Sequence, residues 1–86
     1  MTLLLLLVST FLPAQNQFNQ YFNTGIEKYN KGDFNGAVSD FSKALNNRNE
    51  AKSDYDIAKA LKDRSLSRMY LGNFDGALND IQKRSN

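Results

Sequence analysis

The sequence predicts an all-α fold of two tandem helix-turn-helix hairpins, and two observations support this. The segment 29–41 reappears as 69–81, forty positions later, with Gly, Asp or Asn, Phe, Gly, Ala, an aliphatic residue and Asp in the same order. Apolar residues also recur at steps of three and four, which is the helical period, and no stretch alternates apolar and polar residues over a strand length. The chain therefore looks like a duplicated helical unit.

The first unit is expected to contain one helix over about 16–30 and a second that starts at Phe34 and stops near 46. Between them, Gly32 can supply the positive φ that ends a helix, and Asp33 can cap the next one. The apolar stripes of the two helices are Phe18, Tyr21, Phe22, Gly25, Ile26 and Tyr29, then Phe34, Ala37, Val38, Phe41, Ala44 and Leu45.

The second unit repeats this plan after a longer lead-in. Ser53 or Asp54 is expected to cap the third helix, and the pair 72–73 turns the chain into the fourth. The predicted inner stripes are Ile57, Ala58, Leu61, Ser65, Leu66, Met69 and Tyr70 on the third helix, then Phe74, Ala77, Leu78 and Ile81 on the fourth.

Gly25 indicates a close approach of two helices, because a glycine inside a helix costs about 1 kcal/mol relative to alanine. We expect it to face Ala37, and its counterpart Ser65 to face Ala77, so that each helix pair forms a tight antiparallel hairpin. Phe34 and Phe74 are then expected to plug the turn ends of the hairpins.

The composition argues against most enzymatic and nucleic-acid functions. The chain has no Cys and no His, which excludes a disulfide framework, a thiolate zinc site, a cysteine nucleophile and the commonest general base. Its 11 basic and 9 acidic residues are interspersed, without the basic stripe of a nucleic-acid binder. Turns and helix surfaces explain the carboxylate spacings, so we expect no catalytic, cofactor or metal site and no enzyme.

The N-terminus has the shape of a secretory signal. An apolar run from Leu3 to Leu12 ends at Pro13, and we expect residues 1–14 to be a signal peptide cleaved after Ala14. A run of about ten residues is too short to cross a bilayer, which needs about twenty. We therefore expect an exported protein, periplasmic or secreted, with no stable membrane span after cleavage; a membrane anchor or a buried helix is the alternative.

The repeated residues resemble the tetratricopeptide repeat (TPR) family, whose helical hairpins stack as an α-solenoid. The resemblance covers repeat one at about 18–47 and repeat two at about 54–84, within a domain of residues 15–86. Arg84 replaces the last small residue, and the period of forty exceeds the family's 34. We expect the insertion to lengthen the third helix or to loosen residues 46–53. The matching positions are Gly25, Gly32, Phe34, Ala37, Phe41 and Ala44, then Ser65, Gly72, Phe74, Ala77 and Ile81.

The resemblance also implies a contact between repeats, in which Asp40 of the second helix faces Arg64 of the third. Asp80 holds the same place in the second unit, where no further helix offers it an arginine. Because repeat arrays bury a continuous core with about three units, the expectation is a fragment of a longer array or a self-associating chain.

By resemblance, the first helix of each repeat lines a concave groove that holds peptides or partner helices. The mixture of apolar residues and lysines in this groove suits an amphipathic or acidic-hydrophobic peptide, with Phe22 and Tyr29 as anchors. It lacks the Lys and Asn arrangement of family members that clamp a C-terminal carboxylate. The predicted protein-binding residues are Asn19, Phe22, Ile26, Tyr29, Lys59, Lys62, Leu66 and Met69.

The expected function is a non-catalytic protein–protein interaction scaffold, and several alternatives stay open. The chain is otherwise a self-associating structural module that pairs through its fourth helix, or the N-terminal fragment of a longer repeat protein. An envelope-bound hydrolase is a third class, which would have to work with carboxylates alone. The apolar groove residues are alternatively core between helices, with Lys59 and Lys62 a solvated face.

Overall fold

The computed structural model describes residues 16–85, and over that range the regular elements are all helices, which confirms the all-α prediction. The predicted signal peptide, residues 1–14, lies outside the described residues. The elements are α2 (Gln17–Asn30), α3 (Phe34–Asn46), the short 3₁₀ helix η1 (Arg48–Glu50), α4 (Asp54–Tyr70) and α5 (Phe74–Ser85).

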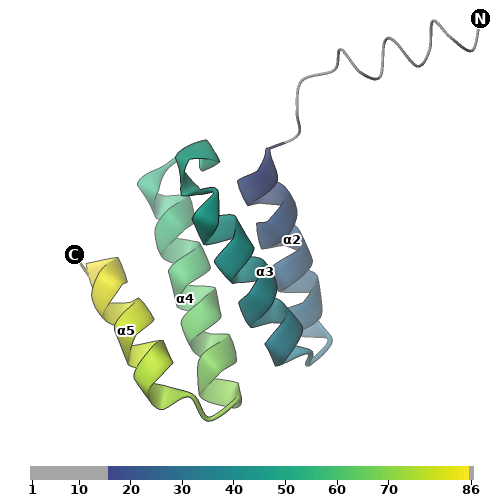
Figure 1. Ribbon diagram of the computed structural model, residues 1–86, viewed down its shortest axis with the longest axis vertical. Coiled ribbons are helices and arrows are strands. Elements are labelled where there is room, and N and C mark those ends of the chain that lie inside the picture. Colours follow the sequence, from purple (N-terminus) through teal and green to yellow (C-terminus); the bar gives the residue numbers. More distant parts are fainter. Residues whose placement is uncertain (1–15, 86) are drawn as a thin grey trace, which may run out of the picture.

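Within residues 16–85, the four α-helices stand side by side in chain order, with α2 and α5 at the two ends of the row (Figure 1). α2 packs against α3, and α4 packs against α5, so that each pair forms a hairpin around a short turn. α3 packs against α4 and joins the two hairpins. The row therefore has two outer edges, one on α2 and one on α5.

The two hairpin turns use the same chemistry at positions forty residues apart. Gly32 and Gly72 have φ values of 83° and 82°, a region that residues with a Cβ rarely adopt. The side chains of Asp33 and Asn73 each accept a hydrogen bond from the backbone amide three residues later, at 2.9 and 3.0 Å. The predicted cap by Asp33 and the predicted positive φ of Gly32 are thus confirmed.

The connection between the hairpins shows where the extra residues go. Ser53 caps α4, which has 17 residues against 14 for α2, so part of the insertion lengthens the helix as expected. The rest forms η1, whose Glu50 accepts hydrogen bonds from the Asn16 side chain at 2.8 Å and the Gln17 amide at 2.6 Å. The connection is therefore tied to the start of α2.

The core lies where α2, α3 and α4 meet, and it consists of Phe18, Ala44, Leu45, Ala60 and Leu61. Two phenylalanine rings, Phe18 and Phe41, are the largest apolar side chains that are fully buried, and burial of each contributes about 1.5–3 kcal/mol. The core therefore holds the second hairpin to the first through α4.

The fourth helix departs from prediction. Its expected inner stripe is largely exposed, with Phe74 66%, Leu78 54% and Ile81 42% accessible, and Phe74 does not plug the turn. Of the predicted stripe only Ala77 is buried, and Asp80, which was not part of it, is buried beside it. In the first hairpin, α4 covers the corresponding side of α3, whereas no described helix follows α5.

The close approach of α2 and α3 occurs at Gly25, although its neighbour is not the predicted Ala37. A Cβ atom built on Gly25 would lie 2.6 and 2.7 Å from two ring carbons of Phe41, which is fully buried. The glycine therefore makes room for an aromatic ring, and the prediction of small residue against small residue is wrong here.

The ion pairs also differ from prediction. Asp40 pairs with Lys28 of its own hairpin, with 2.9 Å between Oδ2 and Nζ, and not with Arg64. Arg64 instead binds the carboxylate of Asp80 at 2.6 and 3.0 Å, and Arg68 binds it at 2.7 Å. Asp80 is therefore fully buried with two arginine partners, and the prediction that it lacks one is wrong.

These pairings arise because a basic residue recurs at the same position of the first helix in both hairpins. Lys28 and Arg68 are forty residues apart and each reaches the carboxylate on the second helix of its own hairpin. Arg64 still links the hairpins, because its third nitrogen donates to Ser42 Oγ of α3 at 3.1 Å.

Replacing Gly25 with alanine is expected to destabilise the protein by about 1–2 kcal/mol, despite the higher helix propensity of alanine. The added methyl group overlaps the Phe41 ring, which has no room to move. Urea unfolding followed by circular dichroism measures this, with Asn23→Ala at an exposed site of α2 as the control. A Gly25→Ala variant as stable as the control would contradict the close approach.

Replacing Asp80 with alanine is expected to cost about 3 kcal/mol or more, because it leaves Arg64 and Arg68 without their shared buried carboxylate. The same unfolding experiment measures the loss. Asn79→Ala, at the exposed neighbouring position, should change stability by less than about 0.5 kcal/mol. Equal stability of the two variants would show that the buried carboxylate does not hold α5.

Candidate functional site

The two halves of the predicted protein-binding set come from α2 and α4, and two contacts join these helices. The Nζ atom of Lys59 lies 5.8 Å from the centre of the Phe22 ring. The rings of Tyr29 and Tyr70 meet edge to face, with centroids 6.0 Å apart. We call the surface formed by the predicted residues of α2 and α4 the α2–α4 groove.

The α2 side of the groove is a packed wall. Phe22 is half-buried, and its ring lies 6.0 Å from Phe18 and 5.7 Å from Phe41. Tyr29 is also half-buried and meets Phe34 edge to face at 5.5 Å. Asn19 and Ile26 are half-buried as well. Phe22 and Ile26, the α2 residues that the core interpretation includes, are therefore partly buried.

The α4 side is more open. Lys59, Lys62 and Met69 are exposed and Leu66 is half-buried. Tyr70, 65% exposed, completes this side but is missing from the predicted set. A depression of about 300 Å³ is lined by Leu66, Met69, Tyr70 and Phe74, and a smaller one of about 120 Å³ by Tyr55, Ala58, Lys59 and Lys62.

Asp63 is a second groove residue that sequence reasoning missed. Its Oδ2 atom is buried and has no hydrogen-bond partner among the described residues. Burial raises the pKa of this carboxyl, although the charges of Lys62 and Lys59 oppose the shift. Burial also raises the pKa of the nearby Tyr29 hydroxyl, with Tyr70 and Asp63 adding to that shift. No sequence motif marks Asp63, because its Oδ2 atom becomes buried only in the folded chain.

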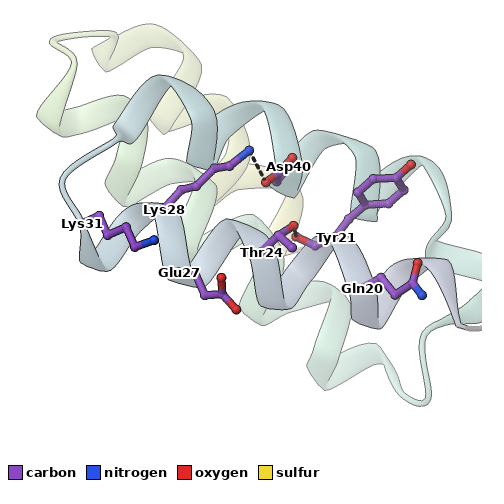
Figure 2. A pocket seen from close by; sticks show the side chains of 7 residues that line it. All are labelled: Gln20, Tyr21, Thr24, Glu27, Lys28, Lys31 and Asp40. Carbon is purple, nitrogen blue, oxygen red and sulfur yellow. Dashed lines mark hydrogen bonds and ion pairs between the residues drawn. The ribbon is translucent and has the colours of Figure 1, made fainter.

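A larger depression, about 500 Å³, lies on the outer edge of α2 and is lined mostly by residues with charged or polar groups (Figure 2). Figure 2 shows the Lys28–Asp40 ion pair across it, and this pair raises the pKa of Lys28 through a hydrogen bond and opposite charge. The depression brings together two acidic and two basic side chains, of which Lys28 and Asp40 form an ion pair. The lining residues are Gln20, Tyr21, Thr24, Glu27, Lys28, Lys31 and Asp40.

Comparisons of the chain with protein-family models, with curated proteins and with solved structures find no match. The TPR resemblance thus rests on the repeated residues themselves. Within residues 16–85, no helix combines the length and the apolar character that crossing a membrane requires.

Replacing Asp63 with asparagine is expected to raise the unfolding temperature at pH 7. The raised pKa means that the folded state binds the Asp63 proton more tightly than the unfolded chain does. Ionisation of Asp63 therefore destabilises the folded state, and this penalty grows as pH rises from the unfolded pKa of about 3.9 through the folded value. Asparagine carries no such charge, so the two proteins should differ at pH 7 and converge near pH 3.

Thermal unfolding followed by circular dichroism at pH 3 and pH 7 measures this effect. Asp54→Asn is the matched control, since Asp54 is exposed at the start of α4. If Asp63→Asn unfolds at a lower temperature than the unchanged protein at pH 7, the folded state favours the charged carboxylate and the prediction is wrong.

Proposed function

We propose that the chain is a non-catalytic scaffold of TPR type, which binds a peptide or a partner helix in the α2–α4 groove. The observation that carries this proposal is the open α4 side of the groove, where Lys59, Lys62 and Met69 are exposed and where Leu66 and Met69 border an apolar depression that Phe74 of α5 completes. An apolar hollow with a charged border is the usual form of a helix-binding surface.

The repeated chemistry of the two hairpins supports the TPR assignment. Both turns pair a positive-φ glycine with a side-chain cap, and both hairpins bury an aspartate against a cation forty residues from its counterpart. A unit that repeats its buried contacts as well as its sequence is what a stacked array requires.

The residues of the groove are expected to have different roles in binding. Other aromatic rings pack against Phe22 and Tyr29, so the conformations of these two side chains are fixed before a ligand binds. Met69 and Leu66 offer contact surface, and Met69 adapts readily to different apolar groups. The lysines favour a ligand with acidic residues beside its apolar ones.

The proposed site of action is outside the cytoplasm. This part of the proposal is supported by the apolar run of residues 3–12 followed by Pro13 and Ala14. The absence of cysteine from the sequence is compatible with an oxidising compartment, because no thiol is available for unwanted disulfides.

The test uses two fluorescent amphipathic peptides that share a Leu and Phe face and differ only in carrying Glu or Lys on the polar face. The Glu peptide should bind at least tenfold more tightly by fluorescence anisotropy. Replacing Lys59 and Lys62 with Glu should reverse the preference, and Met69→Ala should weaken binding of the Glu peptide about fivefold.

Circular dichroism of each variant separates loss of binding from loss of fold, since these three side chains are exposed. Lys52→Glu, an exposed lysine of the connection before α4, is the matched charge control and should leave the preference unchanged. Equal affinity for both peptides, or binding that is unaffected by Met69→Ala, would contradict the proposed groove.

A further inference from the structure

The outer side of α5 is more exposed than the same positions of the first hairpin. Phe41 is fully buried, whereas its counterpart forty residues later, Ile81, is 42% exposed. Phe34 is half-buried beneath Tyr70, whose ring stacks on it at 4.5 Å, whereas Phe74 is exposed. The depression beside Met69 and Phe74 is the counterpart of the place that Tyr70 fills in the first hairpin. The outer side of α5 therefore corresponds to the side of α3 that other side chains cover in the first hairpin.

The opposite edge of the row, on α2, has a different character. On α4, Ala60, Leu61 and Ser67 are buried on the inner side of the helix. The residues forty positions earlier are Gln20, Tyr21 and Glu27, and they line the polar depression shown in Figure 2. The α2 edge carries a charged surface at the places where α4 packs against its neighbour.

The exposed apolar side chains near α5 form a large part of the surface that self-association needs. Together they expose on the order of 600 Å², if each has roughly 200 Å² to expose, which is the upper end for the largest patch on a monomer. A standard interface takes about 800 Å² from each partner, so these side chains would supply at most about three quarters of one, and polar neighbours would have to supply the rest. We call it the α5 edge; it comprises Met69, Tyr70, Leu71, Phe74, Leu78 and Ile81.

We propose that the α5 edge pairs with the α5 edge of a second copy in an antiparallel dimer, and that the polar α2 edge stops assembly at two chains. Pairing the same patch on both chains gives a closed twofold interface. An antiparallel arrangement also brings Asp75, near the start of α5, to the end of the partner helix that carries Lys83. A head-to-tail contact would instead press Glu27 and Lys31 against Leu78 and remove charges from water without partners.

Single-cysteine variants of the full chain test the geometry, because the natural sequence has no cysteine. Leu78→Cys should form an intermolecular disulfide on mild oxidation, since the twofold axis brings the two copies of position 78 together. Thr24→Cys, on the α2 edge, should stay monomeric on a denaturing gel. Efficient cross-linking between the two variants in a mixture would overturn the closed arrangement in favour of a head-to-tail one.

Sedimentation velocity between about 1 and 300 µM measures the assembly itself. The chain should pass from one to two copies and no further, and Leu78→Lys should raise the dimer dissociation constant at least tenfold. Tyr55→Lys, at an exposed aromatic residue away from the α5 edge, is the matched control and should leave it unchanged. A folded monomer throughout the range, or species that keep growing with concentration, would overturn the proposal.

The dimer and the groove are separable in these experiments. Lys59→Glu alters the groove without touching Leu78, so it should leave the sedimentation result unchanged. Met69 belongs to both surfaces, so peptide binding is measured below the dimer dissociation constant, and binding that survives Leu78→Lys would show that the groove does not need the dimer. If the peptides do not bind but the chain dimerises, only the groove proposal is wrong. If the peptides bind but the chain sediments as a monomer, only the dimer proposal is wrong.

Discussion

The buried carboxylate of Asp80 is the interaction on which the second half of the structure depends. α5 contributes little apolar surface to the core, since Ala77 is its only buried apolar residue among the side chains described from 74 to 83. The bonds from Arg64 and Arg68 therefore have an unusual share in holding this helix against α4. Because Arg64 also donates to Ser42, the same group connects α3, α4 and α5.

This constraint explains why the two ends of the row differ. The first hairpin is held by an aromatic core, and its outer edge on α2 is polar and ion-paired. The second hairpin is held by a buried charge network, which leaves the large apolar residues of α5 on the outer side of the helix. The groove and the α5 edge meet at Met69 and Phe74, so both proposed surfaces need α5 in the same position.

Sequence reasoning succeeded where a local rule decides the structure. The helices, the glycine turns and the cap at Asp33 follow from periodicity and turn chemistry within a few residues. Sequence reasoning failed where the partner of a residue depends on which neighbour is nearest in space. Arg64 had carboxylates within reach on two helices, and Gly25 faced either a small residue or a ring. Asp63 was missed because no sequence motif marks a carboxylate whose Oδ2 atom becomes buried only in the folded chain.

Native-state hydrogen exchange of the α5 amides tests most directly whether the Asp80 network holds the second hairpin together. Amides from Ala77 to Ile81 should exchange as slowly as those in the middle of α4, because α5 then opens only when α4 does. Exchange of these α5 amides at the rate of an unfolded chain, while α2 to α4 stay protected, would contradict the account.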